Sequence, residues 1–499
     1  MEAIQTDWLS RWAEYSPIKV AVRDADTGES YTYQQLNNLS NFTAGMLQDR
    51  FGINPGDRVA VLAEFSLTYI VLFGAAQKLG FALVPLNYRL AGPELDYVVG
   101  NSESRLLIVE SKFESLIDGQ PNAGRIESVY SISDLEKEHA AVDGRTFSNP
   151  EVNVSPADPL FVLYTSGTTG FPKGALYTHE MAFWNSINTQ LRLDVTGADH
   201  TLTCMPPFHT GGWNVLLTPF LHHGASVSLM RKFDPDRVMQ LLEEEEATLF
   251  MGVPTMIKMM ADSPEFGKVE LEALRYFIVG GEAMPVPLIE KWQNKGIPVR
   301  QGYGLTEAGP NITSLHHDDA IRKIGSIGKP NFYVQTRLVD EHGQEAGVGE
   351  EGELWIKGPM VTPGYWKNEE ATAKSLEDGW FKTGDILVRD DEGYLYVKDR
   401  LKNMFISGGE NVYPAEVEKL LQTHPDIDEV AVVGVPDEKW GEVGKALVVT
   451  GNRTLAVEDV LTFCQGKLAK FKIPKHVKFV SELPKTDSGK IDRKKLSQL

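Results

Sequence analysis

The hydrophobic pattern of the first part of the chain alternates between short apolar runs and helix-spaced apolar positions. Residues 58–63 and 81–85 are apolar runs of strand length, and residues 66–79 between them have the spacing of a helix. This order predicts a βαβ unit. The same alternation of strand and helix recurs in residues 201–205, 226–229, 235–246 and 248–251. We therefore expect a large domain of α/β subdomains in which helices cover parallel sheets.

The pattern changes after about residue 335, where short strands are separated by turn sequences. Residues 352–357, 380–383 and 394–398 predict β-hairpins in a small β-rich subdomain. Further elements are expected as helices at 414–422 and 457–468 and strands at 429–435 and 446–450. We therefore predict the fold class α/β, with a large N-terminal domain at residues 1–399 and an α+β domain at residues 400–499.

The composition is that of an ordinary globular protein. A chain of 499 residues is too long for one hydrophobic core, which predicts two or more domains. With 42% hydrophobic and 24% charged residues, the chain does not resemble a disordered one. The net charge of −20 argues against a general nucleic-acid binder. We therefore expect no nucleic-acid partner.

The cysteines and the apolar segments bear on the cellular compartment. Cys204 and Cys464 are far apart and lack metal-type spacing, which is typical of a disulfide-free cytoplasmic protein. The N-terminus mixes charged and apolar residues, unlike a signal peptide. The longest apolar stretch, residues 69–76, is too short to span a bilayer. We predict a cytoplasmic location and no membrane-spanning segment.

Residues 164–174 have a pattern typical of an anion-binding loop. An apolar run at residues 160–163 leads into hydroxyls and glycines that end at Pro172 and Lys173. Glycines let the backbone approach an anion, amides and hydroxyls donate hydrogen bonds, and a lysine adds positive charge. The stretch is not a Walker A loop, because Lys173 follows a proline and precedes Gly174. It is either an ordinary polar surface loop or a phosphate site for another ATP chemistry.

Six motifs occur in the order found in one known superfamily. They are residues 164–174, 206–212, 301–307, 383–385, 399–418 and 484–494. Over nearly its whole length the chain resembles the adenylate-forming superfamily of acyl-CoA synthetases, nonribosomal peptide adenylation domains and insect luciferases. The resemblance implies a ligase that first makes acyl-AMP and pyrophosphate from a carboxylate and ATP, and then passes the acyl group to coenzyme A. It also implies that residues 1–399 bind AMP and that residues 400–499 form a mobile domain with the catalytic lysine.

The resemblance assigns each part of ATP to residues of suitable chemistry. Tyr303 would stack on adenine, and Asp385 would accept from both ribose hydroxyls, with Arg400 as its partner. Thr306 would touch the α-phosphate, and Glu307 would hold Mg²⁺. The predicted metal ligands are Glu307 and Thr165. The predicted ATP site comprises Thr165, Ser166, Gly167, Thr168, Thr169, Gly170, Lys173, Gly280, Gly281, Glu282, Gln301, Gly302, Tyr303, Thr306, Asp385, Arg400 and Lys490.

Lys490 resembles the lysine that such enzymes bring onto the substrate carboxylate and the α-phosphate. Attack of a carboxylate on phosphorus brings two anions together, and an ammonium group offsets this repulsion. No general base is needed, because the carboxylate is already ionised near pH 7. The resemblance places the hinge of the mobile domain at Lys402. The predicted catalytic residues are Lys490, Thr306, Glu307 and His209.

Coenzyme A is the acyl acceptor that the C-terminal sequence favours. The segments 440–442 and 471–475 resemble those that contact the CoA nucleotide in relatives, and residues 407–411 resemble the loop that lines the pantetheine tunnel. The predicted CoA site comprises Gly408, Gly409, Glu410, Trp440, Phe471 and Lys475. An adenylating enzyme with a carrier protein, an amine or oxygen as acceptor is the alternative. A catalytically silent homologue is disfavoured, because Lys490 and Glu307 are both present.

The acid is expected to bind along residues 208–213 and the apolar residues that follow. The predicted acyl pocket comprises His209, Gly211, Gly212, Trp213 and Gly304. Trp213 resembles the gate of long-chain fatty acyl-CoA synthetases, although a core position is the other interpretation. Because this segment has no basic residue, we favour an apolar acyl tail over a dicarboxylate. With Trp213 as the gate, the favoured acid is a medium- or long-chain fatty acid, and an aromatic acid of the cinnamate or benzoate type is the alternative. The expected partners are the acid, ATP and coenzyme A, and we allow for a homodimer.

Overall fold

The chain forms two compact units in a computed structural model. The structure describes residues 4–90, 92–165, 172–281, 284–400, 403–407, 410–437, 440–451, 454–465, 467–468, 470–486 and 491–499. The first unit consists of Met1–Thr336 and Ile356–Phe381, and the second of Arg337–Trp355 and Lys382–Leu499. The boundary of a mobile domain near residue 400 stays a prediction, since compactness does not reveal which segment moves.

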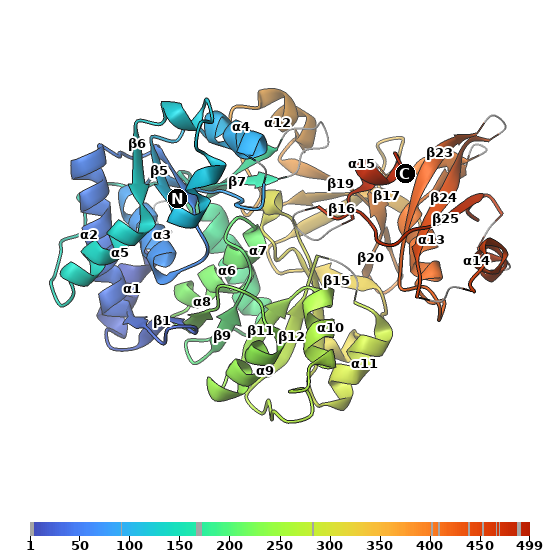
Figure 1. Cartoon of the computed structure of the whole chain (residues 1–499), viewed down its shortest axis with the longest axis horizontal. Coiled ribbons are helices and arrows are strands. Elements are labelled where there is room, and N and C mark those ends of the chain that lie inside the picture. The colour runs from blue at the N-terminus through green and yellow to red at the C-terminus, as the bar shows by residue number, and fades with distance from the viewer. Residues whose placement is uncertain are drawn as a thin grey trace. The chain divides into compact units, whose positions relative to one another are not determined.

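A six-stranded sheet in the first unit contains the predicted βαβ unit (Figure 1). Its strand order is β6-β5-β3-β4-β7-β8, with bounds Arg58–Leu62 (β3), Ala82–Pro85 (β4), Leu106–Val109 (β5), Ser128–Ser131 (β6), Pro159–Thr165 (β7) and Lys173–Thr178 (β8). Helix α3 (Leu67–Leu79) joins the parallel strands β3 and β4. The Ser66 side chain caps its N-terminus, and Gly80 ends it with a φ of 76°. The sequence prediction of this βαβ unit is confirmed.

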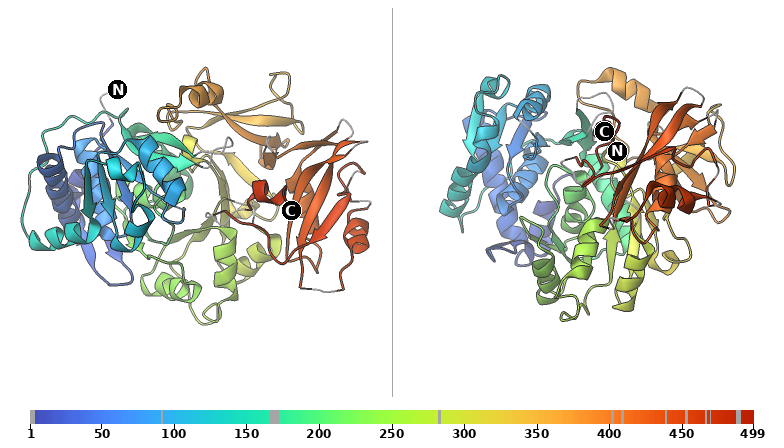
Figure 2. Two further views of the ribbon diagram at one scale, coloured as in Figure 1. Left: turned by 45° about the horizontal axis from the view of Figure 1, so that its top comes forward. Right: turned by 45° about the vertical axis from the view of Figure 1, so that its right-hand side comes forward.

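Helices cover both faces of this sheet, as the two views of Figure 2 show. Val59 and Val61 of β3 join one apolar core, which also contains buried residues of α2 (Tyr33–Phe51) and α3. Ala60 and Leu62 point to a second core with residues of α4 (Gly92–Ser102). Strand side chains alternate between the two faces, so a strand that is apolar at every position is buried on both sides.

A second sheet of the first unit is also mainly parallel. Its strands follow the order β15-β14-β13-β12-β11-β9-β10-β1-β2. Their bounds are Val20–Asp24 (β1), Ser30–Thr32 (β2), His200–Thr203 (β9), Ser226–Leu229 (β10), Leu249–Gly252 (β11), Tyr276–Val279 (β12), Val299–Tyr303 (β13), Thr313–Leu315 (β14) and Ser326–Pro330 (β15). Pairing is parallel from β1 through β10, β9, β11 and β12 to β13, and antiparallel at β2, β14 and β15. The α/β fold class is confirmed.

The first unit contains further α-helices and four short 3₁₀ helices within its described residues. They are α1 (Trp8–Tyr15), α5 (Ile132–Ala141), α6 (His179–Leu193), α7 (Thr210–Asn214), α8 (Leu217–His222), α9 (Pro235–Glu244), α10 (Pro254–Asp262), α11 (Val286–Asn294), α12 (Glu369–Ser375) and the 3₁₀ helices η1 (Ser111–Leu116), η2 (Ala123–Arg125), η3 (Thr306–Ala308) and η4 (His317–Asp319). Strand β18 (Leu376–Glu377) pairs with β19. Helices α9, α10 and α11 gather beside β11 and β12 (Figure 1).

The second unit is β-rich at first and α+β towards the C-terminus. Four strands are neighbours in a sheet in the order β16-β17-β19-β20. Their bounds are Gln335–Val339 (β16), Glu351–Lys357 (β17), Trp380–Arg389 (β19) and Leu395–Arg400 (β20). A second sheet has the order β22-β21-β24-β23, with β25 beside β24; its bounds are Phe405–Ser407 (β21), Glu410–Val412 (β22), Glu429–Asp437 (β23), Gly441–Val449 (β24) and His476–Phe479 (β25). The helices are α13 (Pro414–Leu421), α14 (Val457–Cys464) and α15 (Arg493–Leu496).

Several predicted elements of this unit have different bounds in the structure, and the strand expected at 380–383 extends to Arg389. The helix expected at 457–468 ends at Cys464, because the next residue, Gln465, is extended with a ψ of 136°. The strand expected at 446–450 begins at Gly441, since it pairs with β23 along its whole length. Long-range pairing extends a strand beyond its most apolar part, and a local apolar pattern cannot show this.

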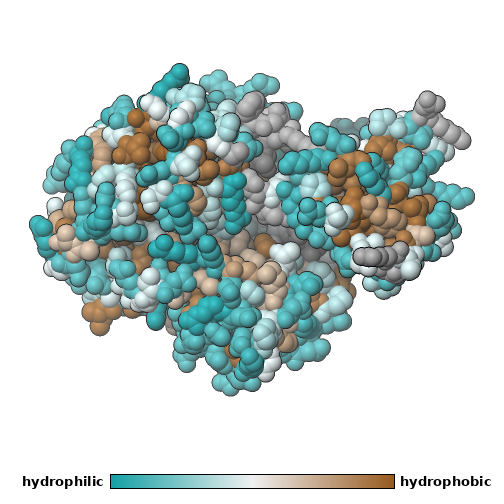
Figure 3. Space-filling view, viewed as in Figure 1, coloured by the Kyte–Doolittle hydropathy of each residue, from teal (hydrophilic) through white to brown (hydrophobic). Residues whose placement is uncertain are grey.

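The polarity of the surface and the lengths of the helices are those expected of a globular protein of this composition. Hydrophilic side chains cover most of the first unit on the face in Figure 3, and apolar ones form small scattered patches. Within the described ranges, no helix combines the length and apolar character needed to cross a membrane.

Two buried histidines make the folded chain sensitive to acid. Burial lowers the pKa of His139 and of His179 from 6.5 to about 4. The folded state therefore holds the neutral rings, whereas the unfolded chain takes up protons below pH 6.5. Each ring therefore leaves the free energy of unfolding unchanged above pH 6.5 and lowers it as the pH falls towards 4. The loss is on the order of 3 kcal/mol for each ring.

We predict that His139→Gln will flatten the decline in the free energy of unfolding between pH 6.5 and pH 4. The measurement is urea unfolding at several pH values. His342→Gln is the control, because that side chain is exposed. If both variants follow the pH profile of the wild type, buried His139 is not a source of the acid sensitivity.

Candidate active site

The predicted phosphate loop joins two paired strands of the first unit. Strand β7 ends at Thr165, β8 begins at Lys173, and these two residues lie opposite each other in antiparallel register. The hairpin therefore fixes both ends of the loop. The predicted loop residues Ser166, Gly167, Thr168, Thr169 and Gly170 lie outside the described residues.

The predicted adenine residues lie at the carboxyl ends of two adjacent parallel strands. Val279 of β12 pairs with Gln301 of β13, which brings the Gly280–Gly281 turn beside Gly302 and Tyr303. The side chain of Gln301 is buried, and its Oε1 accepts a hydrogen bond from the Met284 amide at 3.1 Å. Its Nε2 has no partner among the described residues. This buried donor suits a ligand with acceptor nitrogens, such as adenine; Glu282 lies outside the described residues.

Glu307 lies on η3, which follows shortly after β13, the strand of Gln301 and Tyr303. Its carboxylate Oε1 accepts a hydrogen bond from the Tyr365 hydroxyl at 2.9 Å, and its carbonyl accepts one from the Thr362 amide at 2.7 Å. The Lys173 ammonium lies 5.3 Å from the centre of the Tyr365 ring. Tyr365 thus connects two residues that the sequence predicted at the phosphates, Lys173 and Glu307. The sequence analysis missed Tyr365 and Thr362, which are close to η3 only in the folded chain.

The predicted metal ligands have the chemistry that Mg²⁺ prefers. Glu307 offers a carboxylate and Thr165 a hydroxyl, and Mg²⁺ binds hard oxygen donors. A carboxylate has about four acceptor positions, and the hydrogen bond from Tyr365 holds the Glu307 carboxylate at one of them. The residues present therefore fit a magnesium ion.

The predicted acyl segment forms the loop before α7 and the first turn of that helix. The centre of the Phe208 ring lies 5.1 Å from the centre of the Tyr88 ring and 4.7 Å from that of the His209 ring. A Cβ on Gly212 would lie 2.5 Å from the Pro206 carbonyl oxygen, so glycine is required there by a close backbone approach. A Cβ on Gly211 would lie 3.7 Å from Met251 Cε and 3.8 Å from Met205 Cε, in ordinary contact.

Gly304, the last predicted acyl-pocket residue, is also fixed by backbone packing. A Cβ there would collide with the backbone carbonyl of Pro310. The glycine therefore lets the segment after Tyr303 fold back on the chain near Pro310.

Trp213 is fully buried in an aromatic cluster of the main core. Its ring centre lies 4.6 Å from that of Phe65 and 5.1 Å from that of Phe161, and its Nε1 donates to the Pro207 carbonyl at 2.7 Å. Its exposed fraction is 0%. This geometry favours the core interpretation of Trp213 over that of a gate.

Three buried asparagines connect the acyl segment to the chain after Glu307. Asn311 Nδ2 donates to the Val215 carbonyl at 3.2 Å, and Asn185 Nδ2 donates to the Asn214 carbonyl at 2.7 Å. The Asn311 amide also donates to Asn185 Oδ1 at 3.4 Å. These amides fix the acid-binding and nucleotide-binding segments relative to each other. Asparagines at buried helix positions are an unusual pattern that could have indicated this cluster.

The predicted ribose residues of the second unit lie opposite each other. Asp385 of β19 pairs with Arg400 of β20 in antiparallel register. Asp385 is buried, and its amide donates to Thr383 Oγ1 at 3.1 Å. The sequence analysis proposed the two residues as partners, and the register makes them neighbours across the strands.

Two predicted CoA residues of the second unit come together. The Lys475 ammonium lies 5.0 Å from the Trp440 ring centre, within the range of a cation–π contact. Ser407 pairs with Gly441 next to Trp440, and Glu410 begins β22. Phe471 packs against the core of this unit. Gly408, Gly409, the predicted hinge Lys402 and the predicted catalytic Lys490 lie outside the described residues.

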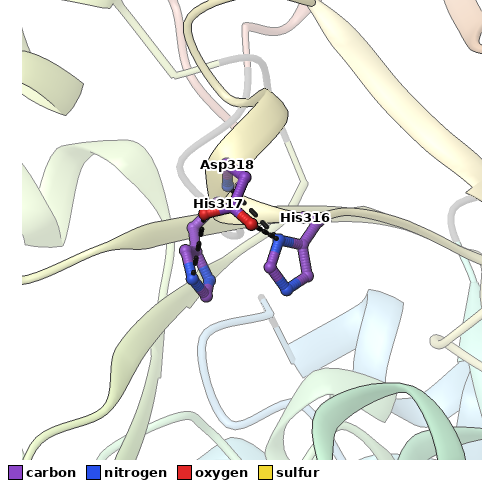
Figure 4. A group of neighbouring side chains, drawn as sticks. All are labelled: His316, His317 and Asp318. Atoms are coloured by element: carbon purple, nitrogen blue, oxygen red, sulfur yellow. Dashed lines mark hydrogen bonds and ion pairs between the residues drawn. The ribbon is translucent and has the colours of Figure 1, made fainter.

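A cluster of His316, His317 and Asp318 has the composition of a metal site but the wrong hydrogen bonds (Figure 4). Arg300 donates to His317 Nδ1 at 3.2 Å and lies 3.0 Å from His316 Nε2. A guanidinium only donates, so His317 Nδ1 accepts from Arg300, while His316 Nδ1 accepts from the Asp318 amide at 3.3 Å. These two lone pairs are engaged in hydrogen bonds, which a metal would have to displace.

Two family models match most of the chain. The model of AMP-binding enzymes matches residues 9–366, and the model of the AMP-binding enzyme C-terminal domain matches residues 416–490. The chain therefore belongs to the family of AMP-binding enzymes, and it is an AMP-forming acid–CoA ligase of the adenylate-forming type.

Known relatives of the chain act on different acids. It is 39% identical to a feruloyl-CoA synthase of an Amycolatopsis species, over 97% of this chain and 96% of that protein. It is 38% identical to a long-chain-fatty-acid–CoA ligase of Mycobacterium tuberculosis, over 97% of this chain and 96% of that protein. A structure of the o-succinylbenzoate–CoA synthetase of Bacillus subtilis with ATP and a magnesium ion has a TM-score of 0.87 and 30% identity, covering 98% of this chain and 99% of that one.

Proposed function

We propose that the protein joins an apolar carboxylic acid to coenzyme A through a bound acyl-AMP. In the first step a carboxylate oxygen forms a bond to the α-phosphorus of ATP, and pyrophosphate leaves. In the second step the CoA thiol gives up its proton to solvent, its sulfur bonds to the acyl carbon, and the bond from that carbon to the AMP oxygen breaks, so that AMP leaves with that pair of electrons. The observation that carries this proposal is the contact chain from Lys173 through Tyr365 to Glu307, which joins the two segments expected at the phosphates.

The residues of this chain orient and stabilise the reacting groups. Lys173 and the loop before it bind the phosphates, and Lys490 offsets the charge that develops as the carboxylate approaches. Glu307 and Thr165 would hold a magnesium ion, which neutralises phosphate charge. Asp385 accepts hydrogen bonds from the ribose hydroxyls, and Arg400 is its partner.

The second step would use the C-terminal domain in a different position. Trp440 and Lys475 form an exposed aromatic and cationic pair, which suits the adenine ring and phosphates of CoA. One position of this domain cannot serve both Lys490 at the carboxylate and this pair at CoA. Rotation about Lys402 between the two steps is therefore part of the proposal.

A compact aromatic acid is the favoured substrate, which revises the preference drawn from the sequence. The fatty-acid preference relied on Trp213 as a gate, but that ring is fully buried. The Phe208 and Tyr88 rings pack against each other, and a Cβ at Gly211 would contact the ends of Met205 and Met251, so the predicted acyl segment has apolar neighbours. A feruloyl-CoA synthase is among the relatives.

A medium- or long-chain fatty acid is the second candidate. Met205 and Met251 are unbranched and can change rotamer, so they could move apart to admit an alkyl chain. A relative is a long-chain-fatty-acid–CoA ligase. Transfer to a non-CoA acceptor would be the third outcome.

Two further predictions concern the oligomeric state and the location of the protein. A homodimer stays a prediction. A cytoplasmic location also stays a prediction, and it rests on two cysteines that are both free.

The test is pyrophosphate release with a panel of acids and acceptor thiols. The panel holds cinnamates, benzoates, arylacetates and fatty acids of graded length, each with CoA, pantetheine or cysteamine. We expect the highest kcat/KM for an aromatic acid with CoA. A rise in kcat/KM with each added methylene would assign a fatty acid instead, and equal rates with all thiols would contradict a CoA site.

A further inference from the structure

Tyr365 lies on a segment that is fixed on both sides to the strand after the phosphate loop. The Trp366 amide donates to the Gly174 carbonyl at 2.7 Å, and the Leu176 amide donates to the Gly364 carbonyl at 3.0 Å. Tyr365 itself forms an isolated antiparallel bridge with Ala175. Its backbone is therefore held along β8, a few residues from Lys173.

The same segment also holds Glu307. The Thr362 amide donates to the Glu307 carbonyl at 2.7 Å, and Thr362 Oγ1 donates to the Leu176 carbonyl at 2.7 Å. The Tyr365 hydroxyl lies 2.9 Å from Glu307 Oε1. The main chain and the side chain of Glu307 are thus both bonded to a segment that is anchored on β8.

The phenol of Tyr365 donates its proton in this contact. A carboxylate oxygen accepts, so the Tyr365 hydroxyl donates to Glu307 Oε1 at 2.9 Å. The charge of an ionised carboxylate strengthens such a hydrogen bond. The face of the same ring lies 5.3 Å from the Lys173 ammonium, within cation–π range.

We propose that Tyr365 is a positioning residue for the divalent cation that accompanies ATP. Its hydroxyl restricts the rotation of the Glu307 carboxylate, and its ring keeps Lys173 beside the phosphate loop. Partners that orient a metal ligand change metal affinity or activity by about 10- to 100-fold when they are removed. The inference rests on the proposed function, because it takes Glu307 as the metal ligand.

The test compares Tyr365→Phe with a matched control, Tyr33→Phe. The Tyr33 hydroxyl is buried and donates to the Ala225 carbonyl at 2.7 Å, so this control also loses one hydrogen bond. ATP binding is measured by isothermal titration calorimetry, with EDTA and at graded Mg²⁺ concentrations. For Tyr365→Phe we expect the Mg²⁺ concentration that gives half-maximal enhancement of ATP binding to rise about 10- to 100-fold.

Two further readouts separate positioning from a structural role. Tyr365→Phe should bind ATP in EDTA as the wild type does, since its ring remains beside Lys173. It should also convert supplied acyl-AMP and CoA to thioester at the wild-type rate, because ATP and its cation take no part in that step. Tyr33→Phe should keep the wild-type Mg²⁺ dependence.

The inference is overturned if Tyr365→Phe keeps the Mg²⁺ dependence of the wild type. It is also overturned if ATP binding falls equally with EDTA and with Mg²⁺, which would mean a general change of the nucleotide site. Failure of the proposed function looks different: the wild-type protein itself would then release no pyrophosphate with any acid.

Discussion

Lys490→Ala is expected to lower the rate of acyl-AMP formation by at least about 100- to 1,000-fold, the scale seen when one charge-stabilising donor is removed from a reaction centre. The ammonium group acts where two anions meet, and alanine leaves that repulsion uncompensated. Thioester formation from supplied acyl-AMP and CoA should continue near the wild-type rate, because the carboxylate has already reacted. Rapid-quench measurement of both half-reactions checks the prediction.

Lys485→Ala is the matched control for Lys490→Ala. Lys485 lies five residues before Lys490 in the sequence and forms an isolated antiparallel bridge with Ile491. Its ammonium pairs with the Glu429 carboxylate at 2.9 Å on the surface. This control loses the same charge but should keep both half-reactions. Equal losses in both half-reactions of Lys490→Ala would remove Lys490 from its assigned role.

Trp213→Ala is expected to lower the free energy of unfolding by about 3–5 kcal/mol, the usual cost of truncating a large buried aromatic side chain. The ring centre lies 5.5 Å from that of Tyr69 and 5.6 Å from that of Phe73, and its exposed fraction is 0%. Its Nε1 also donates to the Pro207 carbonyl, so the loop before α7 should loosen and the KM for the acid should rise. The ranking of acids by kcat/KM should stay that of the wild type.

Trp292→Ala gives the comparison for Trp213→Ala. Trp292 is equally buried, its Nε1 donates to the Ile257 carbonyl at 3.2 Å, and it belongs to a separate apolar core. It should lose similar stability without any change in the KM for the acid. Urea unfolding and steady-state kinetics on the acid panel measure both effects. A new dependence on acyl chain length in Trp213→Ala alone would identify Trp213 as a gate after all.

Local patterns were sufficient where one segment contains the whole signal. Helix α3 was predicted from the helix-spaced apolar residues between two strand-length apolar runs, and Ser66 and Gly80 cap it in the structure. The hairpin of β19 and β20 was predicted because a Gly-containing turn lies between two alternating strands; Arg389 pairs with Leu395 across it. Both features depend on residues that are close in the sequence.

The parts that the sequence could not predict depend on contacts between distant segments. Tyr365 is separated from Glu307 by 58 positions, and Asn311 from Asn185 by 126. No local periodicity reports that such residues meet. The role of Trp213 stayed open for the same reason, because rings from two distant segments, residues 65–73 and β7, surround it. The motifs name the candidate residues, whereas the contacts between distant segments that support some of them became visible only in the fold.

The central claim, an acid–CoA ligase that works through acyl-AMP, is tested most directly by the pyrophosphate assay without CoA. The purified protein is mixed with the best acid, ATP and Mg²⁺, and the products of one turnover are identified by mass spectrometry. We predict one equivalent each of pyrophosphate and bound acyl-AMP, and complete conversion to thioester and AMP when CoA is added. Formation of ADP and phosphate, or release of pyrophosphate only after CoA is present, would contradict this account.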